Sequence, residues 1–189
     1  AQNTAVGTQA LDALTTGDDN TAIGNSTLGA NITGNNNTAV GRLALAANTT
    51  ASNNVSVGQT SLMANTTGSN LTVVGTAAGR FNTTGANNTF LGQNAGHANT
   101  TGTQNTAVGQ AALDAVTTTS FHTAVGYTAL GANTSGVGNT AVGHGSLVAN
   151  TTGGSNNAFG AASLDANISG NSNTAMGQNA LGANTTAVL

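Results

Sequence analysis

Large apolar residues recur along this chain at two positions of a 17-residue unit, and the unit repeats eleven times without insertion or deletion. The sixth position holds Val, Ile, Leu, Met or Phe in every unit, and the eleventh holds Leu in nine units. A disordered chain has no physical reason to keep this spacing, whereas a coil that stacks on its neighbours aligns like residues at every turn. The 17-residue period is too long for a coiled-coil heptad and too short for the repeats that stack pairs of α-helices. The pattern therefore predicts one β-solenoid coil per unit.

A Gly follows the sixth position in every unit, after a short β-favouring stretch such as Thr4, Ala5 and Val6. Gly adopts corner conformations that are costly for a residue with a Cβ, so we expect it at the corners of the coil. The predicted corner glycines are Gly7, Gly24, Gly41, Gly58, Gly75, Gly92, Gly109, Gly126, Gly143, Gly160 and Gly177. Pro is absent, so every amide can donate to a neighbouring coil.

These features predict an all-β chain, a parallel β-solenoid (β-roll) of eleven 17-residue coils, with two corners and two or three short strands per coil. Residues 1–187 form a single solenoid domain in this interpretation. Residues 188–189 are a tail or the start of a further coil.

Asn fills the fourteenth position in nine units, and Leu14 and Val116 replace it in the others. An apolar replacement implies a side chain that points inward. Inward Asn residues stacked about 4.8 Å apart can hydrogen-bond their amides from coil to coil, which satisfies polar groups that are costly to bury. The predicted ladder consists of Asn31, Asn48, Asn65, Asn82, Asn99, Asn133, Asn150, Asn167 and Asn184. Each of these residues also begins a glycosylation sequon, which is incidental if the ladder is internal.

Two further positions carry polar patterns. The third is Asn in nine units, with Leu71 and His122 as exceptions, and predicts a second ladder at another corner. The sixteenth is always Thr or Ser, which suggests a hydroxyl bonded to the turn backbone.

We expect the sixth and eleventh positions to form the core. One Val-type and one Leu-type side chain per coil make a thin core for 17 ordered residues, and the chain has no Cys for disulfides. Further burial against other copies is therefore favoured, and we expect an oligomer. In units five and six, Gly79 and Gly96 replace the core Leu, while Phe81 and Phe90 stand where Ala is usual, so ring volume is expected to compensate.

Charged residues make up only 4% of the chain, against about 25% in an ordinary domain. Arg42 and Arg80 are the only Lys or Arg residues and the net charge is -3, so no basic stripe exists for nucleic acid. No apolar run approaches the roughly 18 residues of a membrane span. We therefore expect no nucleic-acid partner and no membrane span, and an anionic membrane is a poor partner.

The charges fall at positions one, two, eight and twelve, which we predict to face outward together with Tyr127, His97 and His144. Asp12, Asp114 and Asp165 share position twelve but lie several coils apart, so they cannot act as an acid–base pair or close a metal site. His97, His122 and His144 occupy different positions of the unit. We therefore expect no catalytic, cofactor-binding or metal-binding residues and no enzymatic activity.

The string NTAVGxxALxANTTG, nearly intact from Asn139 to Gly153 and from Asn173 to Thr186, resembles the repeats of bacteriophage tail-fibre proteins that carry a C-terminal self-cleaving chaperone domain. It is also similar to the head repeats of trimeric autotransporter adhesins, whose VAIG core matches TAVG and TAIG here. The units are longer than the usual adhesin head repeat. The resemblance covers all eleven units and implies a parallel β-roll, a homotrimer and a role in reaching or gripping a surface.

The expected function is a structural and adhesive segment of an extracellular, cell-surface or virion fibre. Its expected partners are other copies of the chain, in a homotrimer or an end-to-end filament, and a cell-surface glycan or receptor. The alternative is an ice-binding solenoid with a Thr-rich face. The Thr columns at positions four, fifteen and sixteen lack two ranks separated by one residue on a single strand face. Ile32 and Ile168 interrupt one column, and Val55 and Asn157 interrupt another.

Overall fold

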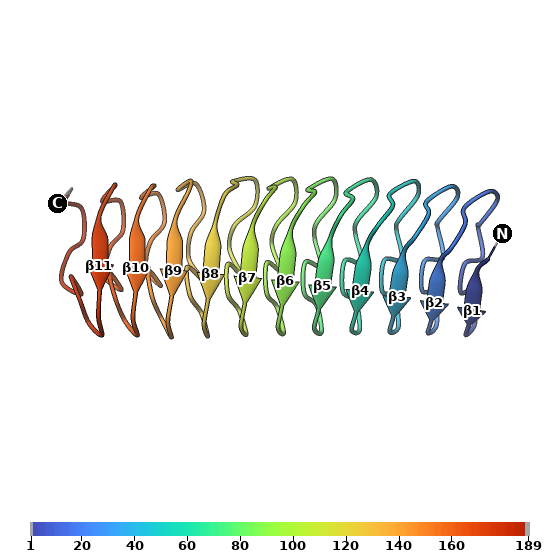
Figure 1. Ribbon diagram of the computed structural model, residues 1–189, viewed down its shortest axis with the longest axis horizontal. Helices are drawn as coiled ribbons and strands as arrows, with labels where there is room; N and C mark the ends of the chain where they lie inside the picture. Colours follow the sequence, from blue (N-terminus) through green and yellow to red (C-terminus); the bar gives the residue numbers. More distant parts are fainter. Residues whose placement is uncertain (1, 188–189) are drawn as a thin grey trace.

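The computed structural model describes residues 2–187, which form a rod of stacked coils with one short strand per coil (Figure 1). The strands are β1 (Thr4–Val6), β2 (Thr21–Ile23), β3 (Thr38–Val40), β4 (Val55–Val57), β5 (Thr72–Val74), β6 (Thr89–Leu91), β7 (Thr106–Val108), β8 (Thr123–Val125), β9 (Thr140–Val142), β10 (Asn157–Phe159) and β11 (Thr174–Met176). They make one parallel sheet in sequence order. The register pairs each residue with its equivalent 17 positions on, as Thr4 pairs with Thr21. The predicted parallel β-solenoid is confirmed.

The prediction of two or three strands per coil is wrong, because the remainder of each coil is turn. Leu28 shows why, with a φ of 50° in the left-handed region that L-residues occupy at a cost. Bonds to the next coil hold the turn in place: the Leu28 amide donates to the Ala44 carbonyl and the Ala30 amide to the Ala46 carbonyl, both at 3.1 Å. Between residues 2 and 187 the structure contains no helix suited to crossing a membrane.

The glycines after the strands take the predicted corner positions. Their φ values run from 118° at Gly177 to 140° at Gly75, a region that favours Gly. Space is equally restrictive, since a Cβ on Gly7 would lie 2.6 Å from the carbonyl oxygen of Gly24. A side chain at this corner would separate the stacked coils.

The core lies between the strand and the turn of each coil. The middle residue of the strand, position five of the unit, points inward and is fully buried at Ala22, Ala39 and Ala107. It meets positions ten and eleven of the turn, as the 2.6 Å contact between the Ser56 and Ser61 hydroxyls shows. The Leu column at position eleven is buried as predicted, for example at Leu28.

The large apolar residues at position six point outward, which corrects the prediction that they form the core. Successive residues of a strand point to opposite faces of the sheet. Because the small side chain at position five points inward, the next residue, at position six, points outward. Val6 is 56% exposed, Ile23 41% and Met176 75%. The interior is therefore even thinner than the sequence suggested.

Units five and six fill their missing core volume with one ring. Phe90 stands at position five of unit six and is fully buried. A Cβ on Gly96 would come within 2.6 Å of the Phe90 ring, and one on Gly79 within 3.0 Å. The predicted compensation holds for Phe90. It is wrong for Phe81, which is 43% exposed on the outside of the turn.

The Asn ladder at position fourteen is present inside the coil. The Nδ2 of Asn82 donates to the Oδ1 of Asn65 at 2.8 Å and to the carbonyl of Gly85 at 2.9 Å. The same pattern continues through neighbouring coils but is interrupted at Val116 and again before Asn184, which bonds to the Ala187 carbonyl instead. The Oδ1 atoms of Asn99 and Asn167 are left buried without a partner. Residues of this column that are fully buried are Asn31, Asn48, Asn65, Asn82, Asn99, Asn133, Asn150 and Asn167. Their sequons are therefore enclosed in the folded chain.

A second ladder occupies position three, as expected. The backbone amide of Asn37 donates to the Oδ1 of Asn20 at 3.0 Å, and the Asn37 Nδ2 donates to the Ala51 carbonyl at 2.9 Å. At the sixteenth position the structure shows no hydroxyl bonded to the turn backbone in residues 2–187, whereas several Thr hydroxyls at position fifteen donate to the next coil. Thr83, for example, donates its hydroxyl to the Thr100 carbonyl at 3.0 Å.

Candidate functional site

The coil presents two outward faces on opposite sides of the core. We call the outward side chains of positions four and six the sheet face. We call the outward side chains of positions nine, twelve and thirteen the turn face. Since positions five and ten meet across the interior, the two faces point away from each other. The predicted Asn ladders and corner glycines belong to the interior and the bends, so neither face is built from them.

The sheet face combines a rank of hydroxyls with a rank of large apolar side chains. Position four is Thr in nine units, and position six is apolar in all eleven. Neither position carries a charged residue in any unit. Exposed members of the apolar rank include Val74 and Phe159, at 40% and 41%. This is a long apolar stripe bordered by Thr hydroxyls.

The geometry of the sheet makes this stripe regular. Parallel strands repeat about every 4.8 Å along the rod, and the two ranks lie about 6.7 Å apart across it, as two strand residues require. Ten such repeats correspond to about 48 Å between β1 and β11. Figure 1 shows the strands following one another in sequence order along the rod. Contiguous apolar surface of this kind marks interaction sites on soluble proteins.

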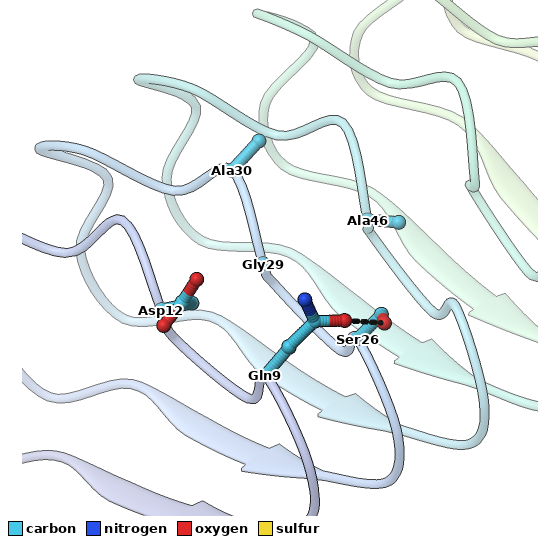
Figure 2. A pocket seen from close by; sticks show the side chains of 6 residues that line it. All are labelled: Gln9, Asp12, Ser26, Gly29, Ala30 and Ala46. Atoms are coloured by element: carbon cyan, nitrogen blue, oxygen red, sulfur yellow. Dashed lines mark hydrogen bonds between the residues drawn. The ribbon is translucent and has the colours of Figure 1, made fainter.

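The turn face is built mainly from small residues. Position thirteen is Ala in ten units, and position twelve includes Gly29 and Ala46. Beside them lies a surface hollow of about 290 Å³ (Figure 2). Its rim includes Gln9 and Asp12, and the Ser26 hydroxyl donates to the Gln9 Oε1 at 3.2 Å. The hollow exists because two consecutive coils after Asp12 have almost no side chain at position twelve.

The polar chemistry of the turn face gathers in the middle of the rod. Arg80, His97 and Asp114 occupy position twelve of three consecutive units, with Phe81 beside Arg80. The Arg80 Cζ lies 5.4 Å from the centre of the Phe81 ring, and the Phe81 and His97 rings meet edge to face at 4.9 Å. The His97 Nδ1 is 3.7 Å from the Asp114 Oδ1. We call these four residues the central cluster.

Sequence reasoning missed the central cluster because the His residues were compared with one another and not with the residues 17 positions away. Burial raises the pKa of the Asp114 carboxyl, and attraction to His97 offsets part of that shift. Arg80 makes no ion pair within residues 2–187, and its Nε is buried without a hydrogen-bond partner. The cluster therefore holds an unpaired cation next to an exposed ring.

Three other aromatic or His residues noted in the sequence, Tyr127, His144 and His122, lie outside the central cluster. Tyr127 and His144, at position eight of consecutive units, stack with ring centres 5.4 Å apart and planes 12° from parallel. His122 is buried in the position-three ladder, where its Nδ1 accepts a hydrogen bond from the Asn139 amide at 3.3 Å. Burial lowers the His122 pKa to about 4, so this ring is neutral at pH 7.

Within the described chain, no three His, Asp, Glu or Cys side chains gather in a way that could hold a metal ion. The geometry defines a β-solenoid with an apolar, uncharged sheet face and a locally charged turn face. Comparison with protein-family models, with curated proteins and with solved structures found no match. The sheet face and the turn face are therefore the candidate functional surfaces.

Proposed function

We propose that the chain is a non-enzymatic, structural and adhesive segment of an extracellular or virion fibre, in which copies associate laterally through the sheet face. The observation that carries this proposal is the apolar rank at position six, which runs the length of the sheet without a charge. An isolated chain exposes this rank to water, and burying apolar surface is the main driving force of association.

A second copy of the same chain is the partner that fits this face best. Each rank repeats with the spacing of the strands, so the apolar ranks of parallel copies can match along their whole length. Two or three such ranks brought to a common axis would shield one another, with the Thr hydroxyls at the border. A homotrimer, the state that the sequence resemblance implies, uses the face in this way.

The proposed mechanism is mechanical. The Asn ladders and the stacked backbone join each coil to the next, which makes a stiff rod. Lateral association adds burial to a thin core. The turn face, on the opposite side, stays free to contact a glycan or receptor.

Light scattering tests the proposal. We expect the chain to form a trimer of about 54 kDa, three times its 18.1 kDa mass. Val108→Lys places a charge on the sheet face and should dissociate the trimer, whereas Gln110→Lys, outside that face, should leave it intact. A monodisperse monomer that melts cooperatively would contradict the fibre proposal.

An ice-binding solenoid is the second candidate, because the sheet face does present two ranks separated by one residue. One rank is Thr and the other is apolar, on a straight parallel sheet. The two candidates need the same face in opposite states, covered in a fibre and free in an ice binder. Thermal hysteresis that is abolished by Val108→Lys and retained by Gln110→Lys would favour the ice binder; its absence in the unmodified chain would exclude that function.

A further inference from the structure

We propose that the central cluster on coils five to seven is a binding site for a carboxylated saccharide, such as a uronic-acid unit of an acidic polysaccharide. This inference deepens the proposed adhesive function, on which it rests, by naming the class of ligand. It places the site on the turn face, which the proposed lateral assembly leaves exposed.

Arg80 supplies the recognition of the carboxylate. A guanidinium offers donors in a planar fork that matches a carboxylate, and the Arg80 group has no ion-pair partner in residues 2–187. Its Nε is also a buried donor without an acceptor, although buried donors are nearly always satisfied. An incoming carboxylate would supply the ion-pair partner that this guanidinium lacks in residues 2–187.

Phe81 supplies an apolar surface beside that charge. Ten units have Ala at this position, and only the unit that carries Arg80 has a ring. The ring is 43% exposed and is held between Arg80 and His97. A pyranose has a face of C–H groups that can lie on such a ring while its charged and hydroxyl groups turn aside.

Asp114 favours a saccharide over an acidic peptide. It lies two coils from Arg80, about 9.6 Å along the rod, with His97 between them. Its carboxylate can accept hydrogen bonds from sugar hydroxyls, whereas it would repel a run of Asp or Glu side chains. Along the rod, Arg80 and the Phe81 ring come first, then the His97 imidazole and then the Asp114 carboxylate. This order fits a ligand that is acidic at one end and rich in hydroxyls at the other.

The test measures binding of a trimer of one terminal galacturonic acid and two neutral hexoses to the assembled full-length chain by calorimetry. We expect Arg80→Gln to weaken binding at least tenfold and Phe81→Ala, which restores the residue of the other units, to weaken it severalfold. Arg42→Gln removes the chain's other cation from position eight and should change binding less than twofold. Arg80→Lys keeps the charge without the planar fork and should give an intermediate loss.

Matched ligands separate the alternatives. The methyl ester of the same trimer should bind at least tenfold more weakly, and so should a short oligoglutamate. Equal losses for Arg80→Gln and Arg42→Gln, equal binding of the ester, equal binding of the peptide, or no binding of the trimer would each overturn the site. Scattering on the same samples keeps the proposals distinct: an assembled chain that does not bind loses only this site, and a binding monomer contradicts only the fibre.

Discussion

Coils two to four and coils five to eight of the same rod follow the repeat to different degrees. In residues 18–68 the ladder positions are all Asn and the core position is always Leu. In residues 69–136 both ladders and the core are interrupted, by Leu71, Gly79, Gly96, Val116 and His122. The strands nevertheless keep the same register through both regions.

The difference shows what the coil requires of its interior. Lost volume at Gly79 and Gly96 is restored by Phe90, and the ladder is continued at His122 by a ring nitrogen that accepts as the Asn oxygen does. The Val116 exchange, by contrast, leaves a buried side-chain atom, the Asn99 Oδ1, without a partner. Volume and hydrogen bonding are thus conserved where residue identity is not, and the central cluster lies on the outside of these irregular coils.

The largest effect is expected from removing the compensation at Phe90. Phe90→Ala should lower the free energy of unfolding by about 3 to 5 kcal/mol, because Gly79 and Gly96 leave the cavity open. Gly96→Leu alone should also destabilise, since its side chain meets the Phe90 ring. The two changes together restore a regular coil and should recover most of the loss, which chemical denaturation of the three variants can measure. Additive losses would mean that Phe90 and Gly96 do not exchange volume.

The next effect is the pH dependence that His122 introduces into the ladder. Its folded pKa of about 4 is below the ordinary value of 6.5, so the unfolded chain binds a proton first as the pH falls. Stability from His122 is complete above pH 6.5 and should fall by about 3 kcal/mol by pH 4. His122→Asn, the residue of the regular coils, should remove this part of the pH dependence. A constant stability difference between the two proteins across that range would show that the ring is not held neutral.

The smallest effects come from exchanging Asn and Val in opposite directions. Asn82→Val should cost about 1 to 3 kcal/mol, because the partners of its amide in the adjacent coils are left buried. Val116→Asn should gain about 1 kcal/mol by giving the Asn99 Oδ1 a donor. Thermal melts of both variants check the pair. A loss at both positions would mean that the central coils are adapted to Val and not merely tolerant of it.

The sequence was sufficient to predict the solenoid, its corners and the Asn ladders, because these depend on columns that repeat every 17 residues. It was misleading about position six, where large apolar residues were assigned to the core by their size. A usable signal was present: Phe90 replaces Ala at position five in a unit that lacks the core Leu, which indicates that position five faces the Leu column. Position six, next along the strand, must then face outward.

Other features could not be predicted from residue type. Leu is a poor residue for a left-handed conformation, so its φ of 50° at Leu28 follows from the bonds between coils and not from local preference. The central cluster required a comparison of Arg80, His97 and Asp114 at a stride of 17, and the unpaired Arg80 Nε required side-chain geometry.

Selective labelling of single cysteines tests most directly whether the apolar rank faces outward and is covered by another copy. The chain has no Cys, so Ala107→Cys, Val108→Cys and Gln110→Cys each offer one thiol to a maleimide reagent. We expect the thiol at position 107 to be protected whenever the chain is folded and the one at 110 always to react. The thiol at 108 should be protected in the assembled protein and reactive after dilution dissociates it. Rapid reaction at 108 in concentrated, folded protein would contradict the account.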